Sequence, residues 1–176
     1  MRRTGQAGRV ALTAVLAALA LVFLYASTLL PAGRMGVVAI AGLFPAAAVV
    51  SGGVAAGALC YAGTSILAFL LLADKGNALL FLLFFGLYPL VKAGIERLRK
   101  LPLEWALKLV FFNGVLTLFW FVFRAVFLAA LPLPIEAAWA VYLAGNAVFR
   151  VYDLGLTKLI ALYAQRVDKI LRKGRA

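Results

Sequence analysis

Residues 10–30 read VALTAVLAALALVFLYASTLL and contain no charged side chain. A helix needs about 20 consecutive apolar residues to cross a bilayer, so this stretch is long enough to cross as one helix. Three arginines precede it, and Pro31–Gly33 ends it. The stretch is longer than the apolar region of an ordinary signal peptide, which is about 7–15 residues. We therefore expect it to be retained as a first membrane span.

Five further apolar stretches follow, separated by short turns. The second stretch carries Pro45, which predicts a kink. Of the whole chain, 66% is hydrophobic and only 14% is charged, whereas a soluble domain is about half apolar and a quarter charged. The sequence therefore predicts an all-α, polytopic integral membrane protein with six transmembrane helices in a single domain. The predicted spans are residues 10–30, 36–50, 54–73, 77–98, 104–131 and 136–163.

The basic residues predict an orientation, because cytoplasmic loops retain Lys and Arg while translocated loops lack them. Fourteen of the 18 Lys and Arg residues lie near the N-terminus, near residues 92–108 or near the C-terminus. Six spans would place all three regions, including a basic tail at residues 164–176, on the cytoplasmic side of the plasma membrane. The basic residues behind the net charge of +12 are then expected to contact lipid headgroups of the membrane. We do not expect nucleic acid as a partner.

The composition argues against most enzymatic chemistry. The chain has no histidine, one cysteine (Cys60) and six scattered acidic residues, whereas hydrolytic and metal sites need such groups in clusters. It also has no glycine-rich phosphate-binding loop. We expect a protein that is not an enzyme, with no catalytic residues, no metal and no cofactor.

Polar residues within the spans are candidate site residues, because charges in a bilayer are costly and usually face protein or a cavity. Arg150 and Asp153 lie three apart on one helix and predict an intramembrane ion pair. Asn113 and Asn146 lie near mid-depth, where they either bond to each other or recognise a ligand. Arg124 lies in the outer third of the fifth span with no acidic neighbour in sequence.

Small residues predict close helix contacts. Ala14 and Ala18 are four apart on the first span, and Gly53 and Gly57 repeat this spacing at the start of the third. Small residues at this spacing let another helix approach closely. The contact is either internal packing or a docking face for a partner membrane protein.

Taken together, the six spans, the alanine-rich first helix and the glycine-rich entry to the third resemble the S component of energy-coupling factor (ECF) transporters. The stretches that carry this resemblance are Ala14–Ala18, residues 35–45 and residues 52–58. The resemblance implies that Ala14 and Ala18 dock a transmembrane coupling protein driven by ATPase subunits. It also implies a vitamin-like small-molecule substrate bound near the outer face. The matching candidates for substrate binding are Arg34, Asn77, Arg124, Trp139 and Asn146.

A second hypothesis is a non-enzymatic membrane scaffold, such as a cell-shape protein of the MreD type. Proteins of that kind are also small and polytopic, with short loops. The small-residue faces would then bind permanent partners, and Arg150 and Asp153 would be structural. An outward-facing cavity among the last three spans would favour transport, whereas a tightly packed interior there would favour the scaffold.

Overall fold

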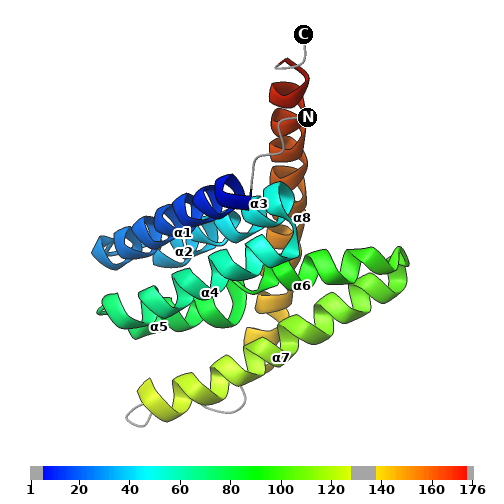
Figure 1. Ribbon diagram of the computed structural model, residues 1–176. Coiled ribbons are helices and arrows are strands. Elements are labelled where there is room, and N and C mark those ends of the chain that lie inside the picture. Colours follow the sequence, from blue (N-terminus) through cyan, green and yellow to red (C-terminus); the bar gives the residue numbers. More distant parts are fainter. Residues whose placement is uncertain (1–5, 128–137, 174–176) are drawn as a thin grey trace. The chain divides into compact units, whose positions relative to one another are not determined.

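A computed structural model describes residues 6–127 and 138–173, and every regular element in these residues is a helix (Figure 1). Side chains are described for residues 6–121 and 139–166. The expected all-α class is confirmed, with no strand in the described ranges.

The described helices belong to two compact units. The first comprises residues 1–94 and 158–176, and the second comprises residues 95–157. The last helix of the chain contributes its first half to the second unit and its second half to the first.

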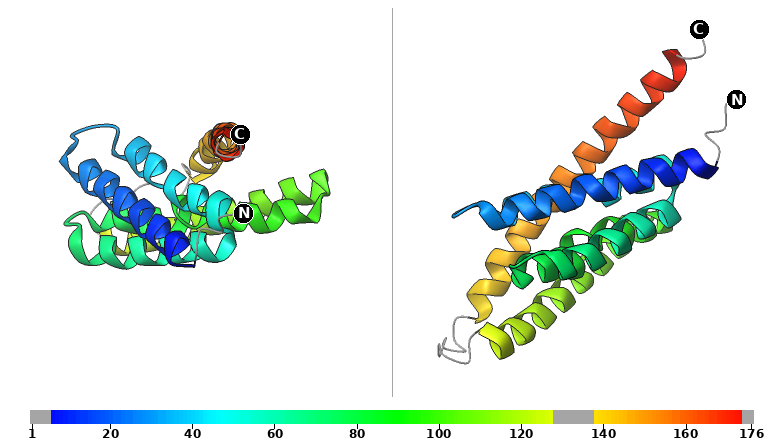
Figure 2. Two further views of the ribbon diagram at one scale, coloured as in Figure 1. Left: turned by 45° about the horizontal axis from the view of Figure 1, so that its top comes forward. Right: turned by 60° about the vertical axis from the view of Figure 1, so that its left-hand side comes forward.

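The first unit is built around α1 (Gln6–Leu29) and α4 (Val54–Leu71), which lie side by side (Figures 1 and 2). The two helices are also linked by a hydrogen bond of 3.3 Å from the Thr64 hydroxyl to the carbonyl oxygen of Ala17. Nearby, Leu16 and Cys60 are buried against Ala48 of the neighbouring helix α3 (Leu43–Gly52). Of the small residues singled out by their spacing, Gly57 on α4 is buried, and a Cβ atom there would collide with Val49 of α3, whereas Ala14 and Ala18 on α1 are exposed.

The second predicted span is interrupted at Gly42. It forms α2 (Arg34–Ala41) and α3 (Leu43–Gly52), with the break between them. A Cβ atom at Gly42 would collide with the carbonyl oxygen of Phe85, so only glycine fits this close approach. Pro45 has no N–H to donate to the carbonyl oxygen of Ala41, four residues earlier, so the break at Gly42 lies where a proline is expected to interrupt a helix.

The fourth predicted span is also irregular. Its elements are α5 (Lys75–Leu80), the π-helical turn η1 (Phe81–Phe85), α6 (Tyr88–Ile95) and the 3₁₀ turn η2 (Glu96–Leu98).

The π-helical turn is stabilised by a neighbouring helix. Gly86 N–H donates to the carbonyl oxygen of Phe81 at 2.8 Å, five residues back. The hydroxyl of Tyr61 on α4 donates to the carbonyl oxygen of Leu82 at 2.8 Å. A π-helical turn leaves main-chain groups poorly paired, and such turns are frequent at functional sites. Here a side chain of α4 satisfies one of the carbonyls.

The second unit contains α7 (Leu101–Phe127) and the first half of α8 (Ala138–Lys173). At about 1.5 Å per residue, the 27 residues of α7 extend roughly 40 Å. The basic tail predicted from residue 164 continues α8 as helix through Lys173.

Five described helical segments are long and apolar enough to cross a membrane. The first half of α8, which carries Asn146, Arg150 and Asp153, is not among them. The five segments are Gln6–Leu29, Arg34–Gly52, Val54–Leu71, Lys75–Leu98 and Leu101–Phe121.

Candidate functional site

The line of contact between α7 and α8 in the second unit carries polar side chains from both helices. We call it the α7–α8 seam. Its polar residues are Lys108, Asn113 and Thr117 on α7, and Tyr142, Asn146 and Asp153 on α8.

Aromatic packing sets the register of this seam. The rings of Phe112 and Phe149 stack with centroids 4.5 Å apart and planes 9° apart. One turn along, a Cβ atom at Gly145 would lie 3.2 Å from the Leu116 side chain. Phe112 stacks on Phe149, and Leu116, which is later on α7, lies against Gly145, which is earlier on α8. The two helices are therefore antiparallel.

A buried cation lies at one end of the seam. The Lys108 ammonium is 2.9 Å from Glu96 Oε1 and 3.3 Å from Asp153 Oδ2. Lys108 and Asp153 are only 5% and 2% exposed, whereas the Glu96 side chain is 41% exposed. Buried charges are costly unless paired, so this triad fixes α7, α8 and the turn η2 to one another.

Trp105 brings a second cation to the same end. Its ring lies 5.6 Å from the Lys108 ammonium and 5.2 Å from the Arg150 guanidinium. Both distances are within cation–π range. The predicted partners Arg150 and Asp153 thus have different contacts: the carboxylate of Asp153 receives the Lys108 ammonium, and the guanidinium of Arg150 lies over Trp105.

The middle of the seam is a reciprocal amide pair. Asn113 Nδ2 donates to Asn146 Oδ1 at 3.1 Å, and Asn146 Nδ2 donates to Asn113 Oδ1 at 3.0 Å. The hydroxyls of Thr117 and Tyr142 lie 2.6 Å apart one turn further along. The bond between the two asparagines, one of the two alternatives that the sequence leaves open, is present in the structure.

The chemistry of the seam is that of charge and hydrogen bonding. The Lys108 ammonium with its two carboxylates can exchange a proton or bind a small polar ligand. The two asparagine amides can exchange their mutual hydrogen bonds for bonds to a ligand. In the residues that the structure describes, no group of three or more His, Cys, Asp or Glu side chains is placed to hold a metal ion.

Two predicted substrate-binding residues lie in the first unit and are engaged with neighbouring helix ends. The Arg34 guanidinium lies 3.3 Å from Asp74 Oδ2, and its Nε donates to the carbonyl oxygen of Leu30 at 2.7 Å. Asp74 also caps α5 by accepting from the main-chain N–H of Asn77 at 3.3 Å. The Asn77 side chain is buried and donates to Ser27 Oγ of α1 at 3.0 Å. Asp74 therefore brings Arg34 and Asn77 together.

The remaining predicted residues are placed as follows. Asn146 belongs to the α7–α8 seam, and Trp139, at the start of α8, is 70% exposed. The side chain of Arg124 lies outside the described residues. Ala14 and Ala18 are exposed on α1, so that face is open for a partner helix.

The sequence did not single out Lys92 or Lys108 as buried groups. Both lie in the basic stretch that we assigned to the cytoplasmic boundary, yet they are only 2% and 5% exposed. One available signal was the spacing of Tyr142, Asn146 and Asp153, which places three polar residues on one side of a helix.

No protein-family model matches this chain, and no curated protein or solved structure is significantly similar to it. The function of this chain is therefore inferred from the chemistry of the described residues.

Proposed function

We propose that the chain is an integral protein of the plasma membrane with six spans and both termini in the cytoplasm. Five apolar helical segments of sufficient length support this proposal. In this arrangement the first half of α8 is the sixth span. Its polar residues are paired with side chains of α7. Polar groups at membrane depth are usually tolerated through such pairing with other protein groups.

Within that membrane we propose that the protein is the substrate-binding subunit of a small-molecule uptake transporter. The observation that carries this proposal is the α7–α8 seam, which holds Lys108 and Asp153 almost fully buried in a chain with few charges. Ionisable groups inside a membrane commonly mark substrate or ion pathways. The seam also lies on the last two helices, where the resemblance to S components implies the ligand walls.

The exposed face of α1 supports the second half of this proposal. Ala14 and Ala18 are exposed in the described structure and lie four residues apart. Such a face suits a coupling membrane protein that works with ATPase subunits, because small side chains permit close helix approach.

A binding experiment tests the transport proposal. The purified full chain would be analysed by native mass spectrometry for a co-purified ligand and by thermal shift against a panel of water-soluble vitamins. We expect a ligand to raise the melting temperature. Asn146→Leu should weaken binding about ten-fold, since one lost hydrogen bond of about 1.4 kcal/mol corresponds to that factor. The control is Thr28→Ala, a partly exposed position on α1 whose hydroxyl donates to the Tyr25 carbonyl of its own helix.

Absence of any co-purified ligand together with no thermal shift across the panel would contradict the transport proposal. Unchanged affinity in the Asn146→Leu protein would instead contradict the role given to the seam.

The second candidate function is a membrane scaffold, favoured by one specific observation. In the described structure, the side chains of Asn113 and Asn146 hydrogen-bond each other. Such bonds are typical of residues that hold two membrane helices together. Affinity purification from membranes distinguishes the two functions. Recovery of cell-wall or division proteins would favour the scaffold, and recovery of ATPase subunits would favour transport.

A further inference from the structure

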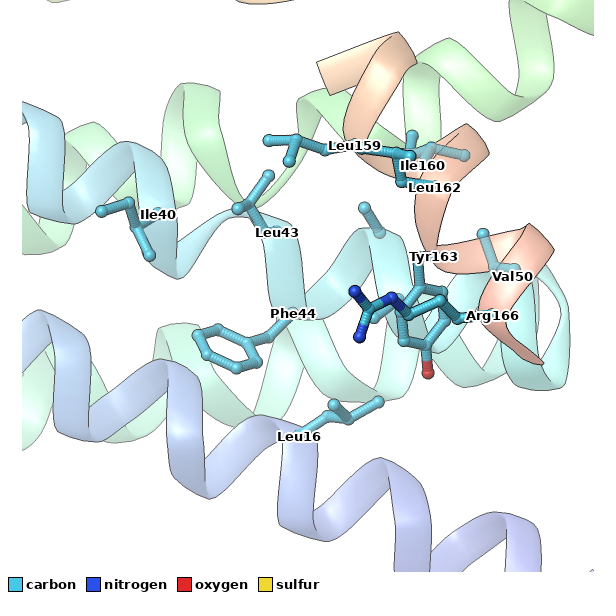
Figure 3. A pocket seen from close by; sticks show the side chains of 12 residues that line it. Leu16, Ile40, Leu43, Phe44, Val50, Leu159, Ile160, Leu162, Tyr163 and Arg166 are labelled. Atoms are coloured by element: carbon cyan, nitrogen blue, oxygen red, sulfur yellow. The ribbon is translucent and has the colours of Figure 1, made fainter. Parts of the chain in front are cut away.

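A separate feature of the first unit is an apolar groove of about 380 Å³ (Figure 3). Helices α1, α2 and α3 and the second half of α8 contribute its walls, which include Leu16, Phe44, Ala47 and Leu162. Ligand-binding pockets typically have volumes of about 300–1,000 Å³. The groove is therefore large enough for one elongated apolar ligand.

One end of this groove is polar. The hydroxyls of Ser51 and Tyr163 lie 2.9 Å apart, and Figure 3 shows the Arg166 guanidinium reaching past the Tyr163 ring toward the groove. Arg9 borders a small adjoining cavity that Ser51 and Leu16 also line. Arg166 of α8 thus lines the groove beside Tyr163, and Arg9 of α1 lines the adjoining cavity beside Ser51.

Within the part of the chain whose side chains are described, no acid balances the charge at this end. Residues 1–73 contain no Asp or Glu, and neither do residues 154–167. Among the residues with described side chains, no carboxylate forms an ion pair with Arg166. The groove therefore has an apolar body and a cationic end, which matches a molecule with an apolar chain and an anionic head.

We infer that this groove binds one anionic phospholipid of the cytoplasmic leaflet, with an acyl chain along the apolar walls and the phosphate near Arg166 and Arg9. The inference depends on the proposed membrane orientation, which places the start of α1, the end of α3 and the second half of α8 at the cytoplasmic side. Basic pockets between transmembrane helices on that side bind anionic headgroups. A free phosphate ion would leave the apolar walls unused, and a neutral lipid would leave the guanidinium groups unused.

Lipid titration followed by native mass spectrometry tests the inference. The full-length protein in detergent would receive phosphatidylglycerol or phosphatidylcholine with identical acyl chains. We expect tighter binding of phosphatidylglycerol. Arg166→Gln should weaken that binding roughly five-fold, the effect of about 1 kcal/mol per basic residue near a headgroup. Phosphatidylcholine binding should fall less, because its cationic choline group offsets the charge of the phosphate, and inorganic phosphate should not displace the lipid.

The matched control is Lys158→Gln, which removes an exposed cation from the same helix outside the groove. Ala47→Phe fills the groove and should weaken binding of both lipids. If Ala47→Phe fails to fold, Arg166→Gln still decides, because it changes an exposed side chain.

Equal affinity for the two lipids, or equal effects of Arg166→Gln and Lys158→Gln, would overturn the inference. Displacement of the lipid by inorganic phosphate would also overturn it. The measurement uses purified protein and added lipid, so it is independent of the vitamin panel. A failed vitamin screen with selective phosphatidylglycerol binding would remove the transport proposal and leave the lipid site in place.

Discussion

Lys108 is the central cation of the second unit's ion pairs. It is buried and contacts one carboxylate from η2 and one from α8. Replacing it with methionine keeps most of the apolar side chain but leaves the buried Asp153 without this ammonium. Loss of one partner from a buried ion pair typically costs about 3–5 kcal/mol. We expect Lys108→Met to lower the free energy of unfolding by about 3 kcal/mol and to reduce the melting temperature of the detergent-purified protein.

A double variant identifies the cause of that loss. Lys108→Met combined with Asp153→Leu should cost less than the sum of the two single changes, because neither charge then remains. Lys100→Met removes an exposed cation and should have little effect. Strict additivity of the two buried changes would contradict the ion-pair explanation.

The asparagine pair gives a second residue-scale prediction. Either Asn113→Leu or Asn146→Leu leaves the other amide without its partner across the seam, at a cost of about 1–2 kcal/mol. The double leucine variant should recover part of this loss by packing apolar groups together. Thermal unfolding of the three variants checks the prediction. The prediction would be contradicted if the double variant lost as much stability as the two single variants lose together.

At the scale of elements, the close approach at Gly42 has a measurable consequence. Alanine there would place a Cβ atom against the Phe85 carbonyl oxygen, so α2, α3 or η1 must shift. We expect Gly42→Ala to lower the melting temperature, with a cost of about 1–3 kcal/mol as for other overpacked sites.

Gly36 provides the matched control for Gly42. It lies in α2 with nothing within 4 Å of an added Cβ atom. Gly36→Ala should be neutral or stabilising by up to about 1 kcal/mol, because alanine has the higher helix propensity. Equal melting temperatures for the two alanine variants would show that the contact with Phe85 is unimportant.

The same elements show how far the sequence alone could predict this fold. The apolar stretches predict helices near the observed positions, because length and hydropathy are properties of each segment. Pro45 predicts an irregularity in the second stretch, but its position at Gly42 and the π-helical turn at Phe81–Phe85 were not predicted. Both lie against a neighbour distant in sequence: the Phe85 carbonyl for the first, and the Tyr61 hydroxyl for the second.

The site was predictable to a similar extent. The polar character of Asn113, Asn146 and Asp153 within apolar stretches marked them as unusual. Lys108 was not recognised, because a lysine next to other basic residues is typical of a membrane boundary. Only the packing of α7 against α8 shows that this lysine is buried.

At the scale of the whole molecule, the six-span topology is open to direct measurement. Reporter fusions would be made with alkaline phosphatase, active only after export, and with a fluorescent protein that matures in the cytoplasm. Fusions after Gly33 and Gly76 should give phosphatase activity, and those after Gly53 and Ala176 should give fluorescence. This pattern follows from the retention of basic residues on the cytoplasmic side.

The fusion after Ala176 is the decisive one, because the first half of α8 is the least apolar of the proposed spans. Fluorescence there requires that this half crosses the membrane. Phosphatase activity at Ala176, with the other fusions as expected, would show five spans and would contradict the proposed position of Arg166 in the cytoplasmic leaflet.

Cys60, the single cysteine of the chain, is fully buried between α1, α3 and α4. Thiol-reactive dyes and spin labels should therefore leave the folded native protein unmodified. One cysteine introduced at Ala18 or near Arg166 would then be the only labelled position. Because the native thiol is buried, it does not have to be replaced before spectroscopy of lipid and partner binding.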